Sequence, residues 1–208
     1  MQITSVNIGK EQAIQGKSGT SGIFKQPSCD PVMIHSQGLV NDVIIDVEHH
    51  GGVDQAVYIY GVPDYDWWSD ELGRDLNAGI FGENITISDL ESAALCVGDR
   101  LHMGDVILEV TAPRVPCVTL ATRMGDPQFI KRFAKAKRYG AYCRVIQPGH
   151  IQQGDAVQLI PYDGTRVSIN TLADAFYNAP IEKAQMQLFL SVPIDIRSRK
   201  YYETKLNE

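Results

Sequence analysis

The sequence has few cysteines and no long apolar run. Its four cysteines, at positions 29, 96, 117 and 143, form no C-x-x-C pair, which disfavours a disulfide scaffold, a zinc finger or an iron–sulfur cluster. No stretch approaches the ~20 apolar residues of a transmembrane helix. Residues 1–10 have the pattern of a strand, not of a signal peptide. We therefore expect a cytoplasmic protein with free thiols and no membrane partner.

Basic residues are also scarce, since 19 Lys and Arg stand against 25 Asp and Glu, a net charge of −6. Such a chain has no general attraction for nucleic acid or anionic membranes, so any anion must be held by a local cluster of donors. No G-x-G-x-x-G or P-loop pattern follows an apolar segment, and the chain contains no internal repeat. These absences disfavour a nucleotide-binding fold and a nucleic-acid partner.

What the chain does contain is a series of short apolar segments. The 44% hydrophobic content is sufficient for a real core in 208 residues. Segments rich in Val, Ile and Tyr alternate with Gly, Pro and Asp turns up to about residue 160. They predict a mainly β fold, an antiparallel or mixed barrel with a few peripheral helices. We expect strands over 2–8, 31–35, 43–47, 55–60, 84–88, 105–111, 141–147 and 156–160, and helices over 62–72 and 127–138.

The composition changes after Pro161. Ser168 is a candidate N-cap for a helix over 170–177, and two further helices are predicted over 181–190 and 193–205. About 40 residues are too few to bury much core alone, so this segment should pack on the barrel or on a partner. We predict a β-barrel domain over 1–163 and a small three-helix domain over 164–208.

Cys117 is the main candidate for chemistry. In the run Pro113-Arg114-Val115-Pro116-Cys117 the two prolines restrict the backbone, which suits a side chain that must hold a fixed position. The positive charge of Arg114 favours the thiolate, the nucleophilic and metal-binding form of cysteine. A buried, inert cysteine is the alternative interpretation.

A second candidate is the turn His49-His50-Gly51-Gly52. Adjacent residues of an extended strand point to opposite faces, so the two histidines are poorly placed to chelate one ion, and no zinc-site spacing is present. The glycines instead favour a turn whose backbone amides approach a ligand, with one histidine as a hydrogen-bond donor. A surface turn with a solvated histidine is the alternative.

Two loops are weaker candidates. Residues 79–84 (Gly-Ile-Phe-Gly-Glu-Asn) lead from a glycine turn into a predicted strand, and residues 16–25 combine small residues, hydroxyls and two lysines. Either loop is able to bind a ligand, and the second suits an anion. An ordinary turn or a flexible polar loop would have the same composition.

Taken in order, these motifs resemble the MOSC domain family, the domain found at the C-terminus of molybdenum-cofactor sulfurases. The resemblance covers nearly the whole chain, and the last ~40 residues resemble the three-helix domain that follows MOSC in stand-alone bacterial members. Asn41 replaces a glycine usual in the family, Ser21 replaces a threonine, and Ile44-Ile45 replaces a more polar pair. The matching residues are Gly16-Lys17, 21–25, Gly38-Leu39, Asp42, Asp46, His50-Gly51-Gly52, Ala56-Val57-Tyr58, Phe81-Gly82-Glu83-Asn84, Gly98-Asp99, 113–117, Gly140, Gly149 and Gly154-Asp155.

The resemblance implies a β-barrel that binds the molybdenum cofactor (molybdopterin). In catalytic members of the family a cysteine ligates molybdenum, and N-hydroxylated compounds, such as N-hydroxylated purine bases, are reduced by oxygen-atom abstraction. It therefore implies Cys117 as metal ligand, with His50 and Asn84 as further catalytic residues. The implied cofactor-binding residues are Cys117, Arg114, Lys17, Ser21, Lys25, Gly51, Gly52, Glu83 and Asn84.

The expected partners follow from this assignment. The chain has no motif for flavin, haem or an iron–sulfur cluster, so a separate reductase should supply electrons. A homodimer is compatible with the sequence. Two alternatives stay open: a carrier of molybdenum cofactor or sulfur without turnover, and an interaction module that has lost the cofactor and docks through its helical tail.

Overall fold

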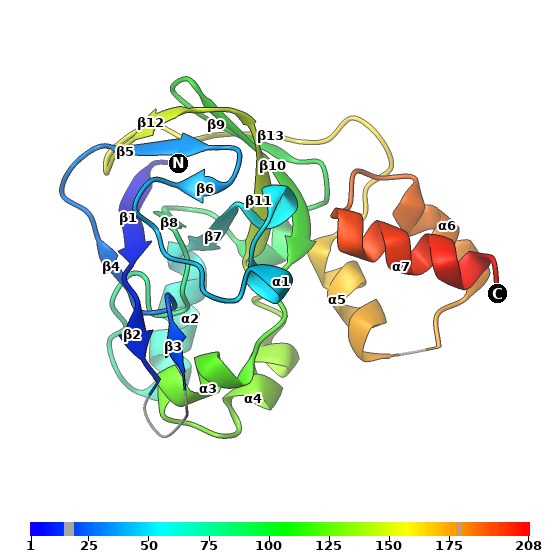
Figure 1. The fold of residues 1–208 in the computed structure, drawn as a ribbon, viewed down its shortest axis with the longest axis horizontal. Helices are drawn as coiled ribbons and strands as arrows, with labels where there is room; N and C mark the ends of the chain where they lie inside the picture. Colours follow the sequence, from blue (N-terminus) through cyan, green and yellow to red (C-terminus); the bar gives the residue numbers. More distant parts are fainter. Residues whose placement is uncertain (15–18, 179) are drawn as a thin grey trace.

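The centre of the molecule is a curved mixed sheet (Figure 1). The computed structural model describes residues 1–14, 19–178 and 180–208, with only the backbone of Glu48 and His49. Within these residues, eight strands form one sheet in the order β13-β9-β10-β11-β7-β8-β1-β4, antiparallel except for the β7–β8 pair. The strands are β1 (Ile3–Gly9), β4 (Lys25–Pro27), β7 (Val57–Gly61), β8 (Ile85–Ile87), β9 (Arg100–Met103), β10 (Val106–Pro113), β11 (Ala141–Gln147) and β13 (Gln158–Ile160).

The described residues form no closed barrel, so this part of the prediction was wrong. The edge strands β4 and β13 have three residues each and do not pair with one another. The sheet curls back only as far as an isolated bridge between Gln2 and Ala156, beside the bond from Ile3 N to Asp155 O (2.9 Å). A closed barrel requires a continuous ladder between every neighbouring pair of strands, and these edges are too short to supply it.

Two small sheets flank the large one. One has the order β12-β5-β6 and the other is the hairpin β2-β3. Their strands are β2 (Gln12–Ala13), β3 (Thr20–Ser21), β5 (Val32–His35), β6 (Gly38–Leu39) and β12 (Gly149–Ile151). Strands of two or three residues carry too little periodicity to be predicted, and of these five only β5 was expected.

Strand β7 separates two hydrophobic clusters. All five of its residues are buried, and alternate side chains point to opposite faces of the sheet. Val57 and Ile59 join an aliphatic cluster, whereas Tyr58 and Tyr60 join an aromatic cluster. The aromatic face is covered by helices α2 (Val62–Leu72) and α4 (Phe129–Ala136), so β7 positions the residues around the aromatic side.

The sequence predicted most of the larger elements. The helix over 62–72 is confirmed as α2, and the helix over 127–138 overlaps α4. The strand over 43–47 was wrong: Val43 N donates to Gly9 O, but the chain is otherwise irregular and then forms α1 (Val47–His50). Helix α3 (Val118–Met124) was not predicted. The structure also has two short 3-10 helices, η1 (Val53–Gln55) and η2 (Ser92–Ala94).

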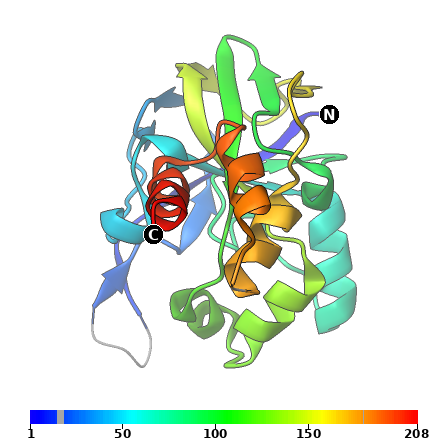
Figure 2. The ribbon, with the colours of Figure 1, turned by 90° about the vertical axis from the view of Figure 1, so that its right-hand side faces the viewer.

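The C-terminal segment forms three helices, as predicted: α5 (Ile169–Tyr177), α6 (Lys183–Leu190) and α7 (Ile196–Leu206). Ser168 caps α5 by accepting a hydrogen bond from Thr171 N (3.0 Å). The three helices lie together on one side of the sheet, and Figure 2 shows the molecule from that side. Ile169 and Ala173 belong to the two clusters of the main body, so α5 shares the core of the rest of the chain. No helix among the described residues has both the length and the apolar surface to cross a bilayer.

Arg144 of β11 joins the sheet to the start of α7. Its Nη2 donates to Pro193 O and Ile194 O (both 3.1 Å), and its Nε lies 3.0 Å from Asp54 Oδ1. The other oxygen of Asp54 accepts from Ile196 N at 2.7 Å. The carbonyls before α7 and the first amide of this helix are thereby satisfied by charged groups of the main body.

We expect Arg144→Ala to destabilise the contact between α7 and the sheet. Loss of hydrogen bonds to a charged group should cost about 2 kcal/mol, which corresponds to a Tm about 4–8 °C lower for a chain of this size. Hydrogen exchange should increase in α7 before β10. Arg132→Ala is the matched control, because Arg132 is 37% exposed and pairs with Glu71 and Asp126, which take no part in the Arg144 contacts. Equal changes in the two variants would contradict this account of the contact.

Candidate functional site

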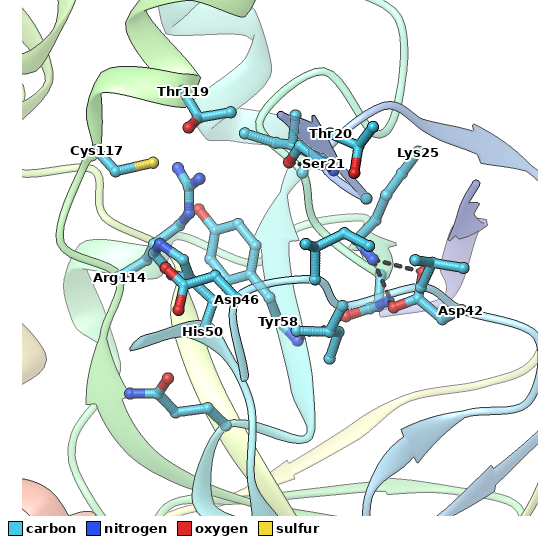
Figure 3. Close-up of a pocket in the computed structure, with 18 of the residues that line it drawn as sticks. Thr20, Ser21, Lys25, Asp42, Asp46, His50, Tyr58, Arg114, Cys117 and Thr119 are labelled. Carbon is cyan, nitrogen blue, oxygen red and sulfur yellow. Dashed lines mark hydrogen bonds and ion pairs between the residues drawn. The ribbon is translucent and has the colours of Figure 1, made fainter. Parts of the chain in front are cut away.

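Cys117 lies at the edge of a cavity of about 330 Å³. It follows β10 after a three-residue link and is the N-cap residue of α3. Its sulfur points toward the guanidinium of Arg114 (Figure 3). The cavity is lined by Ile14, Thr20, Ser21, Gly22, Ile23, Lys25, Asp42, Val43, Ile44, Ile45, Asp46, His50, Gln55, Tyr58, Gly82, Asn84, Arg114, Cys117, Thr119 and Tyr142.

The Arg114 side chain is a buried cation with unsatisfied hydrogen-bonding capacity. The residue is 4% exposed, and its guanidinium lies 5.2 Å from the centre of the Tyr58 ring. Burial works to lower the pKa of Arg114, but Tyr58, Tyr142 and Cys117 raise it above its usual value. Its Nη1 has no hydrogen-bond partner, and no carboxylate of the described residues pairs with it. Since an unpaired buried charge is costly, this guanidinium is suited to bind an anion.

The Cys117 thiol is tuned toward its ionised form. Burial alone would raise its pKa, but a hydrogen bond with His50, the charge of Arg114 and a backbone N–H of Leu120 lower the pKa to about 6. The thiolate therefore predominates at neutral pH, as the sequence predicted from Arg114. By contrast, burial raises the pKa of Cys143 and of Cys96, so these thiols stay protonated.

His50 reaches the site from α1. Its Nδ1 lies 3.3 Å from the Tyr142 hydroxyl. The α1 turn is held by Arg197 of α7, whose Nη2 donates to Val47 O (3.1 Å) and Gly51 O (2.8 Å). An arginine at the end of a helical turn satisfies carbonyl groups that have no intrahelical partner. The C-terminal segment thus fixes the loop that carries His50.

Tyr58 and Tyr142 are site residues that the sequence did not single out. They lie directly opposite each other on β7 and β11, with ring centres 5.3 Å apart, and both contact Arg114. Burial raises the pKa of both hydroxyls, so each keeps its proton. Tyr58 belongs to a segment that matches the MOSC family, but for Tyr142 the sequence signal was an aromatic residue in a predicted strand, which also describes an ordinary core residue.

Lys25 and Asn84 both lie in the cavity wall, and both are engaged with Asp42. The Lys25 ammonium contacts the two Asp42 oxygens at 2.6 and 2.5 Å. Burial lowers the pKa of Lys25, while Asp42 acts to raise it. Asn84 Nδ2 donates to Asp42 Oδ2 (2.8 Å), and Asn84 Oδ1 accepts from Tyr58 N (3.1 Å). In this arrangement Asp42 already balances the charge of Lys25, and Asn84 ties Asp42 to β7.

Ser21 and Glu83, two other predicted site residues, differ in their relation to the cavity. Ser21 lines it, and its hydroxyl accepts from Ile23 N. Glu83 does not line it: one carboxylate oxygen accepts from Tyr65 Oη (2.5 Å), Gly79 N (2.6 Å) and Thr86 Oγ1 (2.9 Å). Burial raises the pKa of Glu83, although these hydrogen bonds oppose the shift.

Gly51 and Gly52, two of the predicted cofactor-binding residues, do not line the cavity. Gly51 is buried under α1, and Gly52 adopts a positive φ of 94°, a conformation that favours glycine.

Lys17 lies outside the described residues. Within the described part of the chain, no three His, Cys, Asp or Glu side chains gather as metal ligands.

The alkylation rate of Cys117 should follow a titration near pH 6. We expect the rate with iodoacetamide to rise through this pH and to level off near neutrality, because the thiolate is the reactive form. His50→Gln removes one stabilising interaction and should shift the profile upward, lowering the rate at pH 6 about threefold or more. Peptide mass spectrometry separates Cys117 from the exposed Cys29. An unchanged profile in His50→Gln would contradict the role of this hydrogen bond.

Comparison with known proteins identifies the family of this chain. The sequence model of the MOSC domain family matches residues 46–158. Protein YflK of Bacillus subtilis is 31% identical over 169 residues, which cover 80% of this chain and 76% of YflK. A protein named reductase from Gibberella moniliformis is 34% identical over 163 residues, covering 74% of this chain but 28% of that protein.

The fold is similar to that of a solved relative over its full length. The crystal structure of YiiM from Geobacillus stearothermophilus matches with a TM-score of 0.81 at 29% sequence identity, covering 99% of this chain and 98% of the other. That match extends through the helical segment beyond residue 158. Since the MOSC model covers more than half of the chain and YflK is similar over most of it, this protein belongs to the MOSC domain family.

Proposed function

We propose that this protein binds a molybdenum–pterin cofactor through Cys117 and Arg114 and reduces N-hydroxylated compounds. The observation that carries the proposal is the buried, carboxylate-free guanidinium of Arg114 beside a thiol with a pKa of about 6. Membership of the MOSC family and the name of the Gibberella relative are consistent with a reductase. The four free cysteines suit a reducing cytoplasm.

The residues present fit such a cofactor. A pterin dithiolene presents sulfur to molybdenum, and a cysteine thiolate is a soft ligand of the same kind. The unpartnered Nη1 of Arg114 offers a donor to an anionic group of the cofactor. The hydroxyls of Ser21, Thr20 and Thr119 line the same cavity and suit further polar contacts. Because Lys25 is paired with Asp42, a cofactor would meet the charges of both side chains together and not the Lys25 charge alone.

The protein side chains would prepare the site for a reduction. When bound, the cofactor supplies oxygen-atom abstraction, by which N–OH, two electrons and two protons yield N–H and water. His50 lies where it can hold or transfer a proton beside Cys117, and Tyr142 keeps its hydroxyl proton as a hydrogen-bond donor. Asn84 would act by positioning Asp42 and β7. We propose a separate reductase as electron donor, and N-hydroxylated purine bases as one substrate class.

Replacement of Cys117 tests the metal ligand. We expect Cys117→Ser, purified from a molybdenum-replete host, to lose about tenfold or more of its molybdenum, because a neutral hydroxyl is a poor substitute for a soft thiolate. Metal analysis and pterin fluorescence measure the loss. Cys29→Ser is the matched control, since Cys29 is exposed and lines no described cavity. Full molybdenum in Cys117→Ser would exclude the ligand assignment.

A reactive thiolate also suits a carrier of cofactor or sulfur, and turnover distinguishes the two functions. We expect cofactor-loaded protein with an artificial electron donor to reduce benzamidoxime or 6-hydroxylaminopurine. Product formation by chromatography is the readout, and Cys117→Ser is the negative control. Loaded protein that fails to turn over either compound would favour the carrier function.

A further inference from the structure

A second cavity reaches Cys117 from the side of the C-terminal helices. Its volume is about 470 Å³, within the range of small-molecule pockets. One wall is the Pro113–Cys117 segment, and the opposite wall comes from α5 and α7. The helical wall consists of Leu172, Phe176, Asp195, Arg197, Ser198 and Tyr202.

The two cavities meet at the residues that surround the Cys117 sulfur. Asp46, His50, Gln55, Cys117 and Tyr142 line both of them. A group held in the first cavity and a molecule held in the second therefore approach each other at Cys117. A reaction between a bound cofactor and a substrate requires such a meeting point.

The two cavities differ in the ligands that they suit. The first contains the unpartnered Nη1 of Arg114, which favours an anion. In the second, the guanidinium of Arg197 already donates to Gly51 O and to Gln55 Oε1. The remaining helical wall includes the apolar Leu172 and the aromatic Phe176 and Tyr202, which favour a flat apolar molecule.

Phe176 is the aromatic residue available for stacking. Its side chain is 63% exposed, unlike that of the buried Tyr202. The Tyr177 ring lies edge-on to it, with centres 5.3 Å apart. A single exposed aromatic residue is common on protein surfaces and carries no meaning alone. Phe176, however, borders a cavity that leads to Cys117.

We propose that the second cavity is the substrate chamber, and that it takes a planar aromatic compound whose N–OH group points toward Cys117 and whose ring stacks on Phe176. This proposal rests on the function proposed above, with the electrons supplied by a reductase and the oxygen leaving as water. Both α5 and α7 lie outside the matched MOSC region of residues 46–158. The helical segment thus sets substrate choice, while the MOSC region holds the cofactor.

Phe176→Ala tests the stacking contact in cofactor-loaded protein. We expect the KM for benzamidoxime to rise about three- to tenfold with kcat nearly unchanged, since a stacking contact is lost and the reacting centre is untouched. The KM for the small aliphatic acetamidoxime should stay within twofold. Tyr201→Ala is the matched control, because Tyr201 is an aromatic residue of α7 that is 51% exposed and lines neither cavity.

Ser198→Trp tests the chamber itself by filling it from a half-buried position on α7. We expect loss of benzamidoxime turnover with the molybdenum content and Tm retained. Unchanged KM values for benzamidoxime in both Phe176→Ala and Ser198→Trp would overturn the proposal.

A direct binding measurement separates this proposal from the proposed function. If loaded wild-type protein turns over no substrate, the reductase function fails, and benzamidoxime binding is then followed by ligand-observed NMR. Binding that is lost in Ser198→Trp but kept in Tyr201→Ala supports the chamber. No binding, or equal binding in both variants, overturns it.

Discussion

The site depends on a buried positive charge that the described residues leave without a carboxylate partner. Arg114 remains a cation because Tyr58, Tyr142 and Cys117 surround its guanidinium with electron-rich groups. The same charge helps to ionise Cys117, so the cation and the thiolate stabilise each other. This pair makes the site suited to a ligand that has both an anionic group and a metal able to accept sulfur.

The remaining structure holds this pair in place. The opposed tyrosines of β7 and β11 form one side, and Asn84 links β7 to Asp42 beside the cavity. On the other side, Arg197 fixes the turn that carries His50, and this arginine belongs to α7. The C-terminal helices are therefore a structural part of the site, where the sequence predicted only a tail that packs on the barrel or on a partner.

Local patterns predicted the elements whose stability is local. The helix predicted over residues 62–72 is α2, which has Pro63 in its first turn, a position that suits proline, and the side chain of Ser168 identified the start of α5. The apolar run 43–47 also had a strand pattern, but Ile44 and Ile45 line a cavity instead of a sheet face. The prediction of a closed barrel was wrong for a related reason: closure depends on the lengths of β4 and β13, which neither the pattern of apolar segments nor the family resemblance specifies.

The sequence by itself determined the stiff position of Cys117 after two prolines and placed Arg114 three residues before it. Both features lie within one short segment, so they need no knowledge of distant partners. Only the tertiary structure decided that Tyr142 meets Tyr58 at Arg114, that Asp42 binds Lys25, and that Glu83 turns away from the cavity. These contacts join residues brought together by strand register and loop packing, which local sequence patterns do not encode.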